Sequence, residues 1–224
     1  MHAPDSIFGV DAAIVDLDGT LVDTLGDFDA ALNATLRELG LPRVDRAAIE
    51  TMVGRGSEHL IRKVLAHVGA PAQLYDSAWD AYQRHYLAVN GTHSHAYEGA
   101  LEGIAALHGR GLRLACLTNK PGEFARSLLA AKGFAPYFDA VFGGDAFERK
   151  KPDPLPLLRT CDALRCAPAR ALMIGDSSND ARAARAAGCP VVLVTYGYNH
   201  GEPVQAADAD AFVRSIAQVP ALIA

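Results

Sequence analysis

The chain has 224 residues, of which 50% are apolar and 21% are charged, and its formal net charge is −5. This is the composition of a globular protein with a sizeable core, and the negative charge argues against a general nucleic-acid binder. The start of the chain has no signal-peptide pattern, no stretch of 18 apolar residues suggests a membrane span, and the four cysteines form no C-x-x-C pair, so we expect a cytoplasmic protein with no membrane partner.

Short apolar runs predict the strands of a parallel sheet. They lie at residues 12–15, 112–117, 140–142, 171–174 and 191–194, with a weaker run at 211–213. Helical patterns separate them at 98–110, 122–132, 154–165 and 179–187. Nearly continuous apolar strands that alternate with helices are typical of a sheet covered on both faces. The fold class that we expect is therefore α/β, with a doubly wound, mainly parallel, Rossmann-like sheet.

One long segment interrupts this alternation directly after the first strand. About 95 residues separate the first two strands, far more than a crossover helix needs. Apolar residues recur there at helical spacing, for example at Phe28, Leu32 and Leu36. We expect residues 24–95 to form an inserted helical cap, and residues 1–23 and 96–224 to form the α/β core.

Polar motifs follow four of the predicted strands. They are residues 16–20 (Asp-Leu-Asp-Gly-Thr), 118–121 (Thr-Asn-Lys-Pro), 150–154 (Lys-Lys-Pro-Asp-Pro) and 175–180 (Gly-Asp-Ser-Ser-Asn-Asp). Ligands of doubly wound sheets bind beyond the carboxyl ends of the strands. The motifs should therefore meet in one cleft, and together they supply several carboxylates, a hydroxyl group, an amide and an ammonium group.

This set of groups has a chemical logic. Several carboxylates in one cleft repel each other unless a cation joins them, and Mg²⁺ is the hard divalent ion that favours oxygen ligands and a phosphate oxygen. Thr118, Asn119 and Lys151 can donate hydrogen bonds to phosphate oxygens. A carboxylate beside such a group can attack phosphorus and form an acyl phosphate, which water then cleaves.

Each motif taken alone has a simpler interpretation. Asp16 and Asp18 could form a turn before Gly19, because Asp-Gly is a common turn sequence. Thr118 and Asn119 could cap a helix, and so could Asp176 and Asp180. Lys151 could be a solvated surface lysine. All four motifs in order, each after a predicted strand, favour the functional interpretation.

The same four motifs resemble those of the haloacid dehalogenase superfamily of phosphohydrolases. The resemblance covers almost the whole chain and implies that Asp16 is the nucleophile and Asp18 the general acid and base. It further implies that Mg²⁺ is held by the Asp16 and Asp176 carboxylates and the Asp18 backbone carbonyl, with Asp180 acting through a metal-bound water or as an orienting partner. Thr118, Asn119 and Lys151 would then hold the phosphoryl oxygens.

Three further segments resemble bacterial phosphoglycolate phosphatases within that superfamily. They are residues 53–56 (Val-Gly-Arg-Gly), 118–121 and 195–201 (Thr-Tyr-Gly-Tyr-Asn-His-Gly). This resemblance implies hydrolysis of a small phosphorylated metabolite, 2-phosphoglycolate, by a monomer or homodimer. Arg55 either contacts the carboxylate of that substrate or points to solvent.

The sequence leaves other functions open. A relative could act on a sugar phosphate or on pyrophosphate, and a phosphosugar mutase like β-phosphoglucomutase would return the phosphoryl group to its substrate. A signalling receiver also combines acidic residues with Thr and Lys, but it is about half this length. A binding module that kept the fold without catalysis would not need a complete set of acceptor, acid and metal carboxylates.

Overall fold

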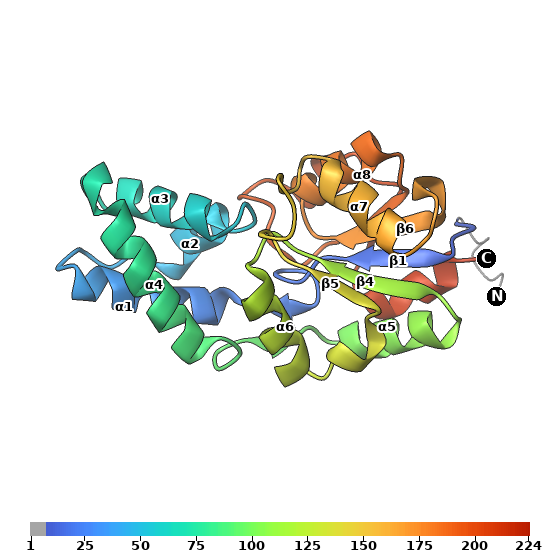
Figure 1. The fold of residues 1–224 in the computed structure, drawn as a ribbon, viewed down its shortest axis with the longest axis horizontal. Coiled ribbons are helices and arrows are strands. Elements are labelled where there is room, and N and C mark those ends of the chain that lie inside the picture. The colour runs from blue at the N-terminus through green and yellow to red at the C-terminus, as the bar shows by residue number, and fades with distance from the viewer. Residues whose placement is uncertain (1–7) are drawn as a thin grey trace.

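The computed structural model describes residues 8–224, and its centre is a six-stranded parallel sheet (Figure 1). In the order in which they pair, the strands are β5 (Ala140–Phe142), β4 (Arg113–Leu117), β1 (Ala12–Val15), β6 (Ala171–Gly175), β7 (Val191–Val194) and β8 (Ala211–Val213). Every pairing in this sheet is parallel. The predicted strands and the α/β fold class are thus confirmed.

Helices cover both faces of the sheet. On one face pack α5 (Ala100–Gly109), α6 (Gly122–Ala131) and the 3₁₀ segment η5 (Ile216–Leu222), and on the other pack α7 (Leu155–Ala163) and α8 (Ser178–Ala187). Ala13 and Val15 of β1 point to the first face, whereas Ala12 and Ile14 point to the second. All four side chains are buried, which explains why the strand is apolar throughout and does not alternate.

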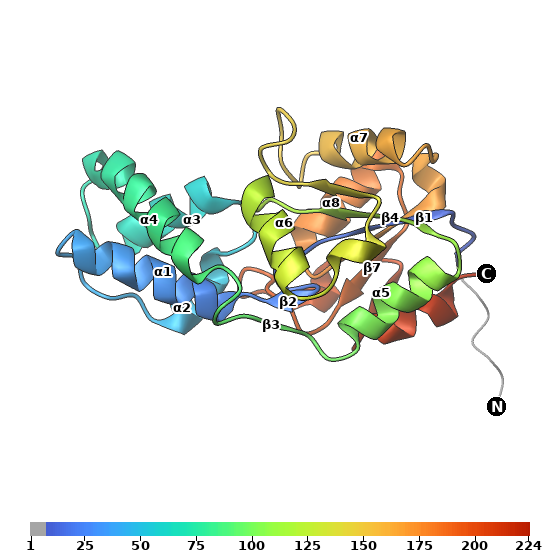
Figure 2. The ribbon, with the colours of Figure 1, turned by 60° about the horizontal axis from the view of Figure 1, so that its bottom comes forward.

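Residues between β1 and β4 form a group of helices beyond the carboxyl ends of the strands (Figures 1 and 2). They are α1 (Leu25–Glu38), α2 (Arg46–Met52), α3 (Ser57–His67) and α4 (Tyr75–Val89), and they share a hydrophobic cluster to which Phe124 and Tyr198 also belong. Helix α2 was not predicted from the sequence. The helix has seven residues, about two turns, so its apolar residues are too few to establish a helical period.

A short antiparallel ribbon connects these helices to the sheet. Strand β2 (Val22–Asp23) precedes α1 and pairs with β3 (His95–Ala96), which follows α4. Strands of two residues are too short to give an alternating pattern, so the ribbon was also missed. It brings both connections of the inserted helices together at one place.

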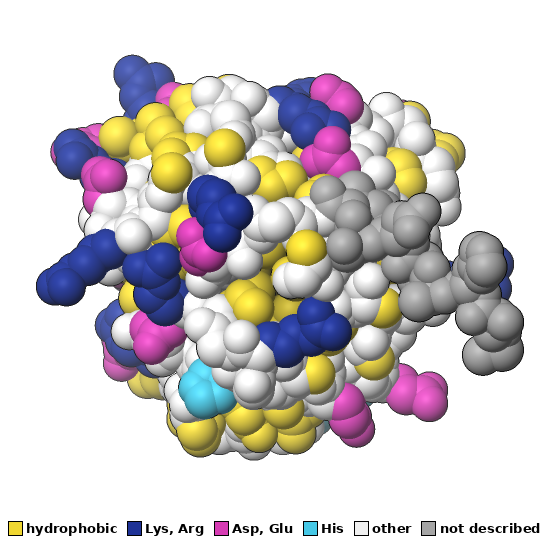
Figure 3. Space-filling view, turned by 90° about the vertical axis from the view of Figure 1, so that its right-hand side faces the viewer, with side chains coloured by type: hydrophobic (Ala, Val, Ile, Leu, Met, Phe, Trp, Pro, Cys, Tyr) yellow, Lys and Arg dark blue, Asp and Glu magenta, His cyan; other side chains and the backbone are white. Residues whose placement is uncertain are grey.

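Among the residues that the structure describes, the end of the sheet that faces away from these helices shows no charged patch of one sign. Lys and Arg side chains alternate there with Asp and Glu and with apolar groups (Figure 3). None of the helices within residues 8–224 combines the length and apolar character needed to cross a bilayer. The cysteines form no disulfide, and Cys116, Cys161 and Cys189 are buried.

Helix α5 offers a test of how much the core stabilises the fold. Leu107 is fully buried against the sheet, whereas Leu87 on α4 is 62% exposed. We expect Leu107→Ala to lower the free energy of unfolding by about 2–5 kcal/mol, because it leaves a cavity. Leu87→Ala, the matched control, should change it by less than about 0.5 kcal/mol. Urea denaturation of the two variants measures the difference, and equal losses would contradict the described packing.

Candidate active site

The strand order brings three polar motifs together. Strand β1 lies between β4 and β6, so Asp16, Thr118 and Asp176, which follow these three strands, are neighbours. The backbone N–H of Asp16 donates to the Ile174 carbonyl at 2.9 Å, which extends the ladder by one residue. The polar side chains therefore start from rigid backbone positions.

The turn after β1 separates Asp16 from Asp18. The Leu17 carbonyl accepts the backbone N–H groups of Leu21 at 2.9 Å and Val22 at 3.1 Å, which turns the chain sharply. Gly19 has a φ of +83°, and a Cβ atom there would lie 2.2 Å from Asp176 Oδ2. Glycine is therefore required, both for the backbone conformation and for the close approach of the two loops.

Asp16, Asp176 and Asp180 form a buried acidic cluster. One oxygen of each carboxylate lies within 4.8 Å of the others. Asp176 accepts hydrogen bonds from the Thr20 hydroxyl at 3.0 Å and from the Tyr198 backbone N–H at 2.6 Å. These bonds hold Asp176 in place, and they explain part of the Tyr-rich motif at 195–201, to which the sequence assigned no role in the site.

Asp180 is the third residue of α8 and has two tasks. Its Oδ2 accepts the Ser177 backbone N–H and hydroxyl, which forms a capping box at the start of the helix. Its Oδ1 accepts a hydrogen bond from Lys151 Nζ at 2.7 Å. The capping interpretation and the cluster interpretation both hold for this residue, and both of its oxygens have donors within the chain.

Lys151 is a buried cation, not a surface lysine. Its side chain is 2% exposed, donates to the Leu117 carbonyl at 2.8 Å, and places Nζ 3.0 Å from Asp16 Oδ1. Burial by itself lowers the pKa of Lys151, but the carboxylates of Asp16 and Asp180 more than offset this, so the pKa is raised and the side chain stays charged.

The acidic cluster fits a divalent cation. Burial raises the pKa of Asp16 to about 7 despite the attraction of Lys151, and the Asp180 charge adds to the rise. Burial, Asp180 and Asp16 likewise raise the pKa of Asp176 well above its usual range. The approach of Lys151 to Asp16 Oδ1 is too oblique for a hydrogen bond, so this buried oxygen has no donor among the described residues. A hard cation between Asp16 and Asp176 would satisfy it.

Asp18 lies on the other side of the cleft, toward the inserted helices. Its Oδ1 accepts a hydrogen bond from Lys120 Nζ at 2.9 Å. Lys120 also bonds to the Tyr86 hydroxyl, and Nζ lies 4.8 Å from the ring centre of Phe28. The sequence placed Lys120 in a motif but assigned it no role, because its position next to Asp18 depends on the folded chain.

Thr118 and Asn119 differ in what they offer a ligand. The Thr118 oxygen accepts the Lys120 backbone N–H at 3.2 Å, so its own O–H remains a donor for the cleft. The Asn119 side chain donates to the carbonyls of Gly54 and Lys151, each at 2.9 Å, and accepts the Lys151 N–H at 3.0 Å. In this arrangement the Asn119 side chain braces two loops, and only its backbone N–H can turn to a phosphate.

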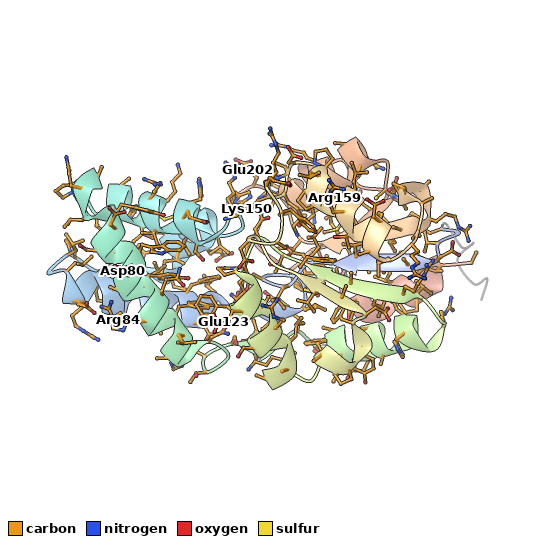
Figure 4. The ribbon with its side chains drawn as sticks, viewed as in Figure 1. Asp80, Arg84, Glu123, Lys150, Arg159 and Glu202 are labelled. Carbon is orange, nitrogen blue, oxygen red and sulfur yellow. The ribbon has the colours of Figure 1, made fainter. Side chains whose placement is uncertain are left out.

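The loop at 53–56 closes the cleft from the side of the inserted helices. The Gly54 carbonyl accepts hydrogen bonds from Asn119 and from Asn179, the latter at 3.2 Å. Next to this loop Glu58 pairs with Lys150 at 2.6 Å, and Lys150 lies at the boundary between the inserted helices and the sheet (Figure 4). Arg55 is exposed and does not line the cleft in this arrangement.

One cavity joins these groups. The acidic cluster, the strand-end loops and the inserted helices all border it. Its lining residues are Asp16, Asp18, Phe28, Val53, Gly54, Gly56, Ser57, Leu60, Tyr82, Tyr86, Thr118, Asn119, Lys120, Asp176, Ser177 and Tyr198. Polar groups from the strand ends lie at one end of the cavity, and apolar and aromatic groups from α1, α3 and α4 lie at the other. Such a cavity suits a small ligand with one strongly anionic end.

Comparison with known proteins gives a consistent result. A family model described as haloacid dehalogenase-like hydrolase matches residues 13–194. The phosphoglycolate phosphatase of Thiobacillus denitrificans is 42% identical over 217 residues, which cover 96% of each chain. The phosphoglycolate phosphatase of Nitrosospira multiformis is also 42% identical, over 100% of this chain and 98% of its own.

Solved structures agree with these sequence matches. A predicted phosphoglycolate phosphatase from Haemophilus somnus superposes with a TM-score of 0.91 at 29% identity, over 94% of this chain and 96% of that one. CbbY from Rhodobacter sphaeroides, solved in complex with phosphate, has a TM-score of 0.81 at 27% identity, over 94% of this chain and 96% of its own.

The acidic cluster predicts that a divalent cation stabilises the protein. With Mg²⁺ as the test ion at 100 times its Kd, the free energy of unfolding should rise by about 2.7 kcal/mol. Asp176→Asn should remove most of this gain, whereas Asp162→Asn, at a side chain that is 76% exposed, should keep it. Thermal unfolding with and without the ion measures the effect, and an equal gain in both variants would argue against this site.

Proposed function

This chain belongs to the haloacid dehalogenase-like hydrolase family, and we propose that it is an Mg²⁺-dependent phosphatase that hydrolyses 2-phosphoglycolate through an aspartyl-phosphate intermediate. The observation that carries the proposal is the contrast between two carboxylates on one turn. Asp16 lies beside Lys151 and the acidic cluster, whereas Asp18 lies beside Lys120 and the inserted helices. Two such environments suit two different tasks in one reaction. The names of the two relatives that are 42% identical support phosphoglycolate as the substrate.

Asp16 is the proposed nucleophile. One of its oxygens attacks phosphorus and forms the acyl phosphate, while the bond from phosphorus to the ester oxygen breaks. The Thr118 hydroxyl and the backbone amide of Asn119 would hold two phosphoryl oxygens. Lys151 keeps a positive charge beside Asp16, which reduces repulsion between this carboxylate and an anionic substrate.

Asp18 is the proposed general acid and base. It would give a proton to the departing ester oxygen, and then take one from the water that cleaves the acyl phosphate. Inorganic phosphate and the alcohol are the products, and Asp16 is regenerated. The Lys120 bond fixes one Asp18 oxygen, which leaves the other for the reacting groups.

The metal site would be built from Asp16, Asp176 and the Asp18 backbone carbonyl. Asp180 would act mainly as an orienting residue, because both of its oxygens already accept hydrogen bonds from the chain. When bound, Mg²⁺ supplies positive charge that offsets the negative charge of the phosphoryl oxygens.

Residues 24–95 are the proposed cap. Their contacts with the sheet side of the cleft, through Gly54 and Glu58, exclude water from the cavity and strengthen its charge interactions. Besides these polar contacts, the cap packs on the sheet side through Tyr86 and Phe124, whose ring centres lie 5.0 Å apart, and we propose that it lifts from this small interface to admit substrate and release product.

Replacement of the nucleophile tests the covalent step. We expect Asp16→Asn to abolish turnover, because an amide does not form the acyl phosphate, while the unfolding temperature stays close to that of the wild type. Release of inorganic phosphate from 2-phosphoglycolate is the measurement. Activity near the wild-type level would eliminate the covalent role of Asp16.

Replacement of the acid and base tests the second carboxylate. Asp18→Asn should slow turnover by roughly 10²–10⁴-fold, the usual contribution of general acid and base catalysis. Steady-state kinetics with saturating Mg²⁺ measure the change. A loss of less than about tenfold would mean that another group transfers the proton.

A further inference from the structure

Lys120 is the one cation among the described residues that line the cavity. The second lysine near the cleft, Lys151, donates to Asp180 and the Leu117 carbonyl, and its Nζ lies 3.0 Å from Asp16 Oδ1, so its charge is already shared by two carboxylates. Arg55 is exposed outside the cavity. An anionic group on the part of the substrate that leaves would therefore meet Lys120 and no other positive side chain of the lining.

The surroundings of Lys120 suit a ligand contact better than a purely structural role. Its side chain is 2% exposed, and its one ion-pair partner among residues 8–224 is Asp18, at 2.9 Å. The remaining neighbours, Tyr86 and Phe28, are uncharged and present aromatic rings 4.6 Å and 4.8 Å from Nζ. A buried ammonium group with mostly uncharged neighbours strongly attracts an additional anion, because little water is present to screen it.

The position of Lys120 also matches a particular substrate geometry. In the proposed reaction Asp18 protonates the ester oxygen, and Lys120 donates a hydrogen bond to Asp18. In 2-phosphoglycolate a single carbon separates the ester oxygen from the carboxylate. The substrate carboxylate is therefore close to the ester oxygen that Asp18 contacts. It is also within reach of Lys120, which donates a hydrogen bond to Asp18.

We propose that Lys120 is a specificity-determining residue that binds a carboxylate one carbon from the ester oxygen of the substrate. The inference rests on the proposed phosphatase function and deepens it, because it states which substrate class the cleft selects. The charge-assisted bond joins Lys120 to the leaving group, and the Tyr86 hydroxyl from α4 holds Nζ toward the cavity. Because Tyr86 belongs to the inserted helices, this selection operates when they are docked on the sheet.

The test compares two substrates that differ at one group. Ethyl phosphate has a methyl group where 2-phosphoglycolate has its carboxylate. We expect Lys120→Met to lower kcat/KM for 2-phosphoglycolate at least tenfold more than for ethyl phosphate, mainly through KM. Lys120→Gln keeps a hydrogen-bond donor for Asp18 but loses the charge, and we expect the same selective loss of kcat/KM for 2-phosphoglycolate. This variant replaces Lys120→Met in the test if the Met variant does not fold. Lys120→Arg should restore part of the preference.

Two further variants control for charge and for the alternative cation. Lys63→Met removes an exposed lysine of α3 that lies outside the cavity, and the ratio of the two kcat/KM values should stay at the wild-type level. Arg55→Ala should also leave this ratio unchanged. A fall in the ratio for Arg55→Ala together with none for the Lys120 variants would overturn the proposal and assign the carboxylate to Arg55.

The outcomes also separate this inference from the function on which it rests. Equal losses on both substrates in the neutral Lys120 variants would show that Lys120 only positions Asp18, which overturns the inference and leaves the phosphatase intact. A wild-type enzyme that hydrolyses ethyl phosphate but does not prefer 2-phosphoglycolate would overturn both the substrate and the role of Lys120. Hydrolysis of neither ester would contradict the proposed function itself.

Discussion

The buried ammonium group of Lys151 is the interaction on which the rest of the site depends. A buried charge is tolerated only when it is paired and hydrogen-bonded, and here the partners come from three separate elements. The Leu117 carbonyl ends β4, Asp16 follows β1, and Asp180 belongs to the first turn of α8. One side chain therefore ties three strand-end loops together, and its charge offsets part of the repulsion between Asp16 and Asp180.

The turn after β1 then divides the cleft into two environments. Asp16 stays with Lys151, while the turn at Gly19 carries Asp18 toward Lys120 and the aromatic residues of the inserted helices. Each carboxylate has its own lysine, yet the first pair lies among further carboxylates and the second among rings. The difference in surroundings would allow two identical side chains, two residues apart, to perform the two tasks proposed for them.

The inserted helices are linked to the site through a few hydrogen bonds and through apolar packing of Tyr86 on Phe124. Asn119 and Asn179 bind the Gly54 carbonyl, and the Tyr198 hydroxyl accepts the backbone N–H groups that begin α1. Each such bond contributes only about 0.5–1.5 kcal/mol, which is compatible with the proposed opening of the cap. Tyr198 also donates its backbone N–H to Asp176, which connects the ribbon at the base of the helices to the acidic cluster.

The sequence by itself determined the strands, most helices and the four polar motifs, because buried strands are apolar and each motif is continuous along the chain. It did not reveal α2 or the β2–β3 ribbon, because a helix of seven residues and strands of two residues are too short to show a period. Only the tertiary structure decided that Asn119 braces loops, that Arg55 lies outside the cavity, and that Lys120 faces Asp18. These facts depend on distances between residues far apart in the chain, which local patterns do not encode.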